Sequence, residues 1–194
     1  MGLVRTMLDA NSLTALLQGV RSGEQGAMDS LLALAYGELG ELARAQMQRD
    51  RPGQTLQPTA LVHEAWMKLA PHLDGVEDRR HFFAIASQAM RQVLTDYARR
   101  RTSQKRGGGN HKITIDEAFT PGTDDGGADL VDLDDSLKKL AELNPRHARV
   151  VELRIFGGLT IDETAKTIGV SHGTVESDWF TARAWLRREL ARAH

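Results

Sequence analysis

Apolar residues recur three or four positions apart along most of the chain, with polar residues between them, the spacing of amphipathic α-helices. The pattern predicts four helices before residue 102, with a loop at 71–78, and four after residue 132. Gly23 ends the first helix, Pro58 and Pro145 suit the first turns of two others, and Asn144 can cap the helix that Pro145 begins. The predicted helices are 12–20, capped by Ser12, then 27–47, 59–69 and 81–101, and those beginning near Leu133, Pro145, Ile161 and His172.

The most specific pattern lies at 160–184, where two short helices are predicted around a tight turn. Thr160 and Glu163 have the spacing of a capping box, Gly169 is placed for a turn with positive φ, and Ser171 can cap the second helix. A DNA-reading helix-turn-helix has this form, although an ordinary αα-hairpin can share it. The second helix opens with little positive charge, so base contact there is expected to be weak or helped by a partner. The candidate DNA contacts are Ser171, His172, Thr174, Ser177 and Arg183.

A glycine-rich and acidic stretch separates the two groups of helices. Residues 102–131 contain six glycines and one proline, which predicts a flexible acidic linker at 105–131. Ile113, Thr114 and Ile115 are expected to form a short extended piece within it. The predicted fold is therefore all-α, with helical domains at 10–104 and 132–191 joined by this linker.

Charge is distributed in blocks, although the net charge of the chain is only −1. Residues 79–106 carry eight Arg or Lys and a single Asp, whereas residues 116–135 carry eight Asp or Glu and no basic residue. A block with a net charge of +7 predicts a nucleic-acid surface, and the acidic block predicts a solvated linker.

No pattern in the chain predicts catalysis or a cofactor. His63-Glu64 lacks a second histidine four residues on, and the glycines at 107–109 lack the flanking residues of a phosphate-binding loop. The sequence has no cysteine and no apolar run near the roughly 18 residues of a membrane helix. We expect a cytoplasmic protein that is not an enzyme, binds no metal or cofactor and does not associate with membranes.

Several segments together resemble the extracytoplasmic-function sigma factors of the bacterial sigma-70 family. The N-terminal half carries LVHEAWMKL at 61–69, HFFA at 81–84 and DYARRR at 96–101, which resemble region 2 of these proteins. The C-terminal half carries LNPRHARVVEL at 143–153 and GGLTIDETA at 157–165, which resemble region 4. The resemblance covers about 13–190, with only the linker unassigned. It implies a specificity subunit of RNA polymerase.

The resemblance also implies partners and contact residues. The helix at 61–69 would dock on the clamp coiled coil of the largest polymerase subunit, region 4 would meet the flap of the second largest, and the acidic linker would thread toward the active centre. The helix at 84–101 would hold open the minus-ten element, with Phe82, Phe83 and Tyr97 available for stacking, although a core role is favoured for these aromatics. The implied polymerase contacts are Leu61, Val62, Glu64, Trp66 and Lys68. The implied minus-ten contacts are Arg91, Gln92, Arg99, Arg100, Arg101, Lys105 and Arg106.

One departure from the family suggests regulation. Most members carry an acidic Asp-x-Glu-Asp run before the region 2 helix, and here those positions are Gln57, Pro58, Thr59 and Ala60. A phosphate on Thr59 would restore negative charge at a helix N-terminus. The sequence resembles the subgroup thought to be controlled by a Ser/Thr protein kinase. Thr59 is therefore the first candidate phosphorylation site and Thr55 the second, whereas the simpler interpretation is that Thr59 only caps its helix.

Three alternatives remain at this stage. A stand-alone helix-turn-helix regulator would bind duplex DNA without polymerase, and an anti-sigma-like or scaffold protein would bind polymerase without selecting promoters. The basic block beside aromatic residues argues against both. A compact inactive form, in which the linker or region 4 covers residues 99–101, is a further hypothesis.

Overall fold

Helices make up nearly all of the described residues, so the all-α prediction is confirmed. The computed structural model describes residues 10–47, 57–104, 112–113 and 128–192. The N-terminal bundle contains α1 (Ala10–Arg21), α2 (Ala27–Met47), α3 (Pro58–Leu69), the 3₁₀ helix η1 (Ala70–Gly75) and α4 (Arg79–Gln104). The C-terminal bundle contains α6 (Leu130–Leu143), α7 (Pro145–Ile155), α8 (Ile161–Ile168) and α9 (His172–Arg192).

Several predicted boundaries needed correction. Ser12 is not a cap, because α1 already begins at Ala10. The stretch predicted as a loop at 71–78 is largely the 3₁₀ helix η1. Helix α6 begins at Leu130, so the end of the predicted linker is the first turn of a helix. A shift of this size is common, because a helix end depends on tertiary contacts that periodicity does not reveal.

Little of the predicted linker falls within the described residues. Strand β1 (Lys112–Ile113) pairs antiparallel with β2 (Ala128–Asp129), with Lys112 opposite Asp129. The expected extended piece is confirmed at Ile113, whereas Thr114 and Ile115 lie outside the described residues. The pairing brings the chain back to the start of α6.

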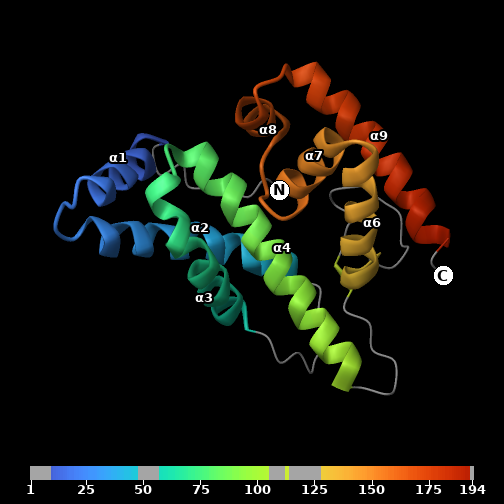
Figure 1. Ribbon diagram of the computed structural model, residues 1–194, viewed down its shortest axis with the longest axis horizontal. Coiled ribbons are helices and arrows are strands. Elements are labelled where there is room, and N and C mark those ends of the chain that lie inside the picture. Colours follow the sequence, from blue (N-terminus) through green and yellow to red (C-terminus); the bar gives the residue numbers. More distant parts are fainter. Residues whose placement is uncertain (1–9, 48–56, 105–111, 114–127, 193–194) are drawn as a thin grey trace.

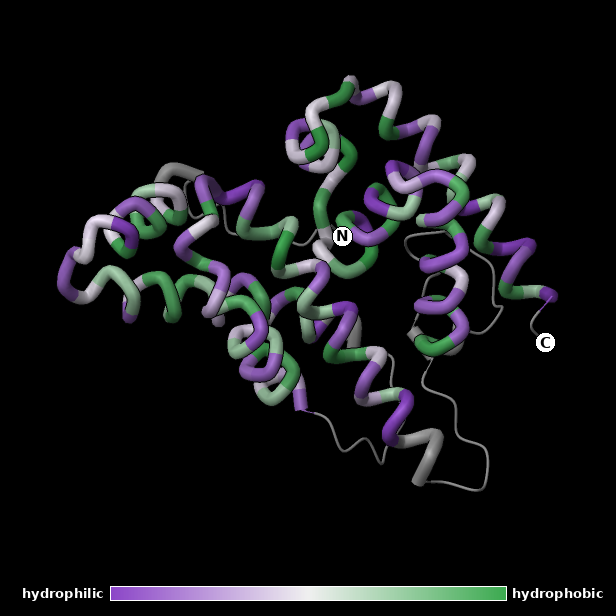
Figure 2. The backbone as a smooth tube through the Cα atoms, in the orientation of Figure 1, coloured by the Kyte–Doolittle hydropathy of each residue, from purple (hydrophilic) through white to green (hydrophobic). Residues whose placement is uncertain are grey.

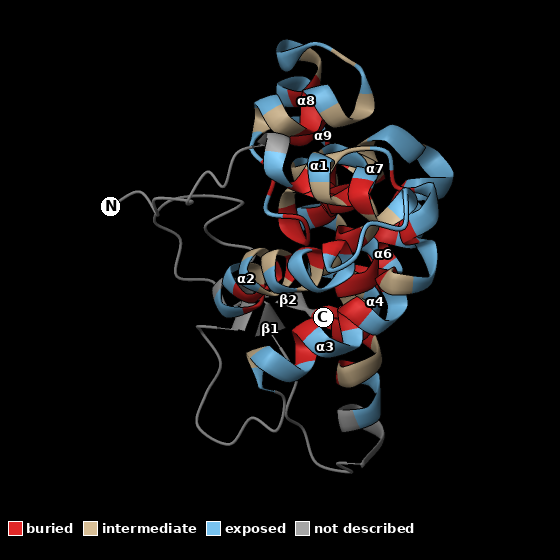
Figure 3. Ribbon diagram, turned by 90° about the vertical axis from the view of Figure 1, so that its left-hand side faces the viewer, coloured by how far each residue is buried: buried red, intermediate tan, exposed pale blue. Residues whose placement is uncertain are grey.

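Helix α4 lies at the centre of the molecule, where it packs within the N-terminal bundle and also against the C-terminal bundle (Figure 1). One side of it contacts α3, and another contacts α6, α7 and α8. The helices alternate polar and apolar residues, and buried residues gather where helices face one another (Figures 2 and 3). The buried apolar residues of both bundles form one continuous cluster. The bundles are therefore packed together and not merely tethered.

Local signals in the C-terminal bundle act as predicted. Asn144 caps α7 by accepting from the backbone N–H of His147. Thr160 and Glu163 form the reciprocal capping box of α8, and Gly169 ends that helix with φ +72°. These caps satisfy backbone groups that a helix end leaves unpaired, and they fix where the chain turns. They end α8 at Gly169, so that α9 can begin three residues later and pack against α8.

Candidate nucleic-acid and polymerase interfaces

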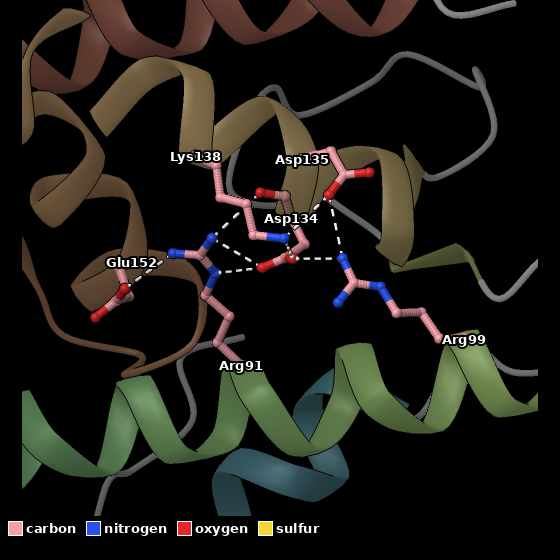
Figure 4. Close-up of polar contacts among 6 residues, drawn as sticks. All are labelled: Arg91, Arg99, Asp134, Asp135, Lys138 and Glu152. Atoms are coloured by element: carbon pink, nitrogen blue, oxygen red, sulfur yellow. Dashed lines mark hydrogen bonds and ion pairs between the residues drawn. The ribbon is translucent and has the colours of Figure 1, made fainter. Parts of the chain in front are cut away.

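Two arginines of α4 are held by carboxylates of the C-terminal bundle (Figure 4). Arg91 Nε donates to Asp134 Oδ1 over 2.9 Å, and Arg91 Nη1 donates to Glu152 Oε2 over 3.1 Å. Arg99 Nη2 donates to Asp134 Oδ2 and to Asp135 Oδ1, in both cases over 3.1 Å. Arg91 and Arg99, both predicted DNA contacts, are thus engaged with protein acids. Together with Lys138, these five residues are called the interbundle cluster.

Asp134 lies at the centre of the interbundle cluster. Its side chain is only 9% exposed, and Lys138 Nζ lies 2.7 Å from its Oδ2. Burial raises the pKa of this carboxyl, but the hydrogen bond from Lys138 and the charge and hydrogen bond of Arg91 outweigh burial, so the pKa of Asp134 is lowered from its ordinary 3.8. Asp134 is therefore a carboxylate at neutral pH, and the cluster is ionic.

Further contacts join the bundles along α4. Arg149 of α7 donates to the backbone oxygen of Ala84 over 3.1 Å and also pairs with Glu152. Arg79 lies 3.5 Å from Glu163 of α8, and Arg80 donates to the backbone oxygen of Lys166 over 3.3 Å. The contacts run from the first turn of α4 to Arg99, so most of one face of this helix is covered.

The loop between α7 and α8 approaches the N-terminal bundle closely. A Cβ atom on Gly157 would lie 3.1 Å from the Cβ of Ser87 on α4. Gly158 has φ +60°, and a Cβ there would meet the Cδ1 of Leu42 on α2. Both glycines therefore permit a backbone approach that a side chain would obstruct.

The other residues of α4 that were predicted to contact DNA differ in exposure. Gln92 and Arg100 are exposed, and Arg101 belongs to the helix, although its side chain is not described. Lys105 and Arg106 lie outside the described residues. Phe82 and Phe83 are buried with ring centroids 5.5 Å apart in an edge-to-face pair, which confirms the core role favoured for them.

The predicted contacts at the start of α9 lie together. Ser171 Oγ accepts from the backbone N–H of Thr174 over 3.1 Å, which confirms the cap. His172 Nδ1 lies 2.6 Å from Asp162 Oδ1, and this hydrogen bond raises the pKa of His172. Ser171, His172 and Ser177 are exposed, and Thr174 is half-buried. A compact polar surface is thus available at the first turns of α9.

Two charged residues of α9 are engaged by side chains of the C-terminal bundle. Asp178 is buried and accepts from Arg146 of α7, with Nε at 2.6 Å and Nη2 at 3.0 Å. Its charge is therefore compensated inside the bundle and does not oppose a DNA backbone. Arg183, a predicted DNA contact, lies over the ring of Trp179 at 5.6 Å, where desolvation lowers its pKa.

The predicted polymerase contacts on α3 are divided between core and surface. Leu61, Val62 and Trp66 are buried, because they form the stripe that packs α3 into the bundle. These three side chains present few accessible atoms in this conformation, and their contact with polymerase stays a prediction. Glu64 and Lys68 are exposed, and the sequence prediction missed Met67, which is 61% exposed beside them.

Thr59 occupies the second position of α3 and is exposed. The N-cap is Gln57, with φ −86° and ψ 145°, so the simpler interpretation of Thr59 as a cap is wrong. The first turn of α3 has no acidic residue. Thr55 lies outside the described residues.

The described residues contain neither a membrane-spanning helix nor a cluster of metal ligands. None of the helices found in the described ranges is both long and apolar enough to span a membrane. Within the same ranges, no three His, Cys, Asp or Glu side chains are grouped as metal ligands would be.

The sequence is similar to those of known sigma factors. Residues 10–192 match the family described as ECF sigma factor. The chain is 31% identical to an RNA polymerase sigma-E factor of Streptomyces avermitilis over 133 residues, which is 67% of this chain and 69% of that protein. It is 28% identical to an RNA polymerase sigma-E factor of Streptomyces antibioticus over 160 residues, 81% of this chain and 85% of that protein.

Proposed function

The chain belongs to the ECF sigma factor family, and we propose on that premise how its two bundles divide promoter recognition. A sigma factor of this family binds core RNA polymerase and promoter DNA as a non-enzymatic initiation factor. Residues 10–104 act as region 2, which binds the clamp coiled coil and the minus-ten element. Residues 132–191 act as region 4, which binds the minus-thirty-five element and the flap. The linker at 105–131 connects them.

The helix-turn-helix is the observation that carries this proposal. The capping box of α8, the left-handed turn at Gly169 and the Ser171 cap place the first turns of α9 at the surface. In a helix-turn-helix those turns enter the major groove, so His172, Thr174 and Ser177 are positioned for base edges. The buried pairing of Asp178 with Arg146 supports this use, because it removes one acidic group from the DNA side.

Helix α4 supplies the minus-ten surface in this proposal. Arg99 and Arg100 follow one another near its C-terminal end, and Gln92, the residue after Arg91, is exposed. Guanidinium groups bind phosphate oxygens strongly, and an exposed amide can read a base. Phe82 and Phe83, in the first turns of the helix, are buried and belong to the core.

The outward side of α3 supplies the polymerase surface. Glu64, Met67 and Lys68 are exposed there, one apolar side chain between two charged ones. Tyr36 Oη and His63 Nδ1 lie 2.7 Å apart, which ties this side of α3 to α2. A charged surface on a fixed helix suits association that charge complementarity accelerates.

The same helix carries the proposed switch, a Ser/Thr kinase acting on Thr59, with Thr55 as the second site. The exposure of Thr59 supports access for a kinase, and its place in the first turn supports an effect on charge. A phosphate adds about −1.5 to −2 charges at pH 7, and the helix dipole favours an anion at that end. Phosphorylation would thus restore the negative charge that basic groups of the clamp require.

The test is run-off transcription with core RNA polymerase on genomic promoter fragments. Wild type is compared with Thr59→Glu, Thr59→Ala and the matched control Ser30→Glu. Ser30 is exposed in the first turn of α2, so this control adds the same charge to the start of another helix. We expect transcripts from Thr59→Glu and much weaker transcripts from the other three.

Each other outcome changes a different part of the proposal. Equal transcripts from all four proteins would retain the sigma activity and remove the switch. Transcripts from both glutamate variants would show that added negative charge at any site is sufficient. No transcript from any protein, with duplex binding in the absence of polymerase, would favour the stand-alone helix-turn-helix regulator instead.

A further inference from the structure

Arg91, Thr95 and Arg99 form one stripe on α4, because residues four apart lie on the same side of a helix. Arg91 is 15% exposed and Thr95 is buried, so the C-terminal bundle covers this stripe. The covering residues are Asp134 and Asp135 of α6 and Glu152 of α7 (Figure 4). All three side chains of the stripe are polar, yet two of them, Arg91 and Thr95, are shielded from solvent.

The covering acids meet the arginines as a phosphate would. Arg91 donates through Nε to Asp134 Oδ1 and through Nη1 to Glu152, and Arg99 donates through Nη2 to the second carboxylate oxygen of Asp134. Arginine binds carboxylate and phosphate through the same forked donor geometry. A nucleic-acid backbone and these side chains therefore compete for the same donors.

The acids of α6 and α7 do not satisfy every polar group of the stripe, as Thr95 shows. Its hydroxyl is buried and has no hydrogen-bond partner among the described residues. A buried polar group without a partner costs free energy, so this face of α4 is better satisfied by a ligand that offers an acceptor there. The oxygen-rich backbone of a nucleic acid is such a ligand, whereas the acids of α6 and α7 are already used by the arginines.

We infer that Asp134, Asp135 and Glu152 form an internal phosphate mimic that closes the C-terminal bundle over the minus-ten surface of α4 and inhibits the free protein. The inference rests on the proposed use of α4 in binding promoter DNA. Nucleic acid cannot reach Arg91 until the two bundles separate, and at Arg99 it must displace Asp134 and Asp135. Core polymerase, by holding the bundles apart, releases the stripe.

The composition of the contact suits a reversible closure. The charged groups of the interbundle cluster are well hydrated when separated, so desolvation offsets much of the attraction gained on closing. The glycine loop at 157–158 permits close packing on α2 and α4 without inserting an apolar side chain of its own. Closure is held by this ionic contact together with the apolar cluster that the bundles share, and loss of one charge leaves the others buried and unpaired.

The test measures closure and nucleic-acid binding separately in the full-length chain. The sequence has no cysteine, so Gln18→Cys and Ala191→Cys, at exposed positions on α1 and α9, accept a pair of labels for a distance measurement. Binding is followed by the anisotropy of a fluorescein-labelled single-stranded DNA of about 20 nucleotides, which exceeds the site size of common single-strand binders. Polymerase is absent from both assays.

Asp134→Asn removes the central charge while preserving the size of the side chain. Its matched control is Glu142→Gln, which removes one charge from an exposed position of the same helix. We expect Asp134→Asn to broaden and shift the label distance and to bind the oligonucleotide at least about tenfold more tightly, because binding is reduced by the fraction of molecules that are closed. Glu142→Gln should match wild type, and adding Arg91→Ala to Asp134→Asn should remove the gain. Circular dichroism confirms that each variant is folded.

Two outcomes overturn the inference and point to different errors. An unchanged label distance in Asp134→Asn would mean that the acids do not hold the bundles together, while the sigma activity measured by run-off transcription would be unaffected. A changed distance without tighter binding would mean that α4 is not a nucleic-acid surface, which would also remove the minus-ten part of the proposed function.

Discussion

Replacing Gly158 by alanine tests the packing of the bundles through their apolar contact, independently of charge. Gly158 has φ +60°, and a Cβ atom there would overlap the Cδ1 of Leu42 on α2. Gly169 is the matched control, because it has φ +72° and nothing within 4 Å of a built Cβ. Both substitutions force alanine into the left-handed region, but only Gly158→Ala creates an overlap between bundles.

The expected difference between Gly158→Ala and Gly169→Ala follows from two energy costs, backbone strain and steric overlap. An L-residue in the left-handed region costs about 1–2 kcal/mol, and both variants bear this cost. Overpacking costs a further amount of about 1–3 kcal/mol, which Gly158→Ala bears only while the bundles are closed. Separation relieves the overlap, so the ratio of closed to open molecules should fall by about 5- to 150-fold. Gly169→Ala should leave that ratio unchanged.

The assay combines urea unfolding with the label distance between positions 18 and 191. Both variants should lose stability in the C-terminal bundle to a similar degree, and only Gly158→Ala should change the distance. Adding Leu42→Ala should restore the short distance, because it removes the Cδ1 atom that the new alanine Cβ would overlap. Identical distances in Gly158→Ala and Gly169→Ala would refute the packing of this loop on α2.

Two further predictions concern a cap and a titration. Thr160→Ala removes the side chain that accepts from the backbone N–H of Glu163, so urea unfolding should show a loss of about 1 kcal/mol from the C-terminal bundle. Asp134 has a lowered pKa when it is closed against Arg91 and Lys138, so its contribution to closure is complete above its ordinary 3.8 and is lost as the pH falls below that value through the lowered pKa. The label distance should therefore increase on acidification, and Asp134→Asn should show no such step.

The parts of the fold that the sequence predicted depend on local chemistry. The capping box at Thr160 and Glu163, the turn at Gly169 and the Asn144 cap each act within a few residues, so the pattern of side chains was enough to place them. The helical periodicity likewise predicted the eight α-helices of the described residues, with errors at their ends. Local signals fix an element without fixing its partner.

The parts that the sequence did not predict depend on packing. Asp134 and Asp135 belong to an acidic block that indicates a solvated linker, yet both lie in α6 and bind arginines of α4. Leu61 and Val62 match the family's docking helix, but their spacing is also that of a buried stripe, and the structure places them in the core. The sequence shows which residues are charged or apolar. Whether each one faces solvent or another helix depends on how the helices pack, which the sequence alone does not show.

Helix α9 lies along the outer edge of the molecule, away from α4 (Figure 1). Its residues Ser177, Phe180 and Thr181 remain exposed while the face of α4 is covered. Duplex DNA that contacts only this outer face gains the same free energy from the closed and the open protein, so it cannot shift the balance between them. Unwound DNA that needs α4 is coupled to opening. Closure of the bundles therefore sets an order for promoter recognition. The protein can bind duplex DNA through α9 while it is closed, but it can hold a single strand on α4 only after it opens.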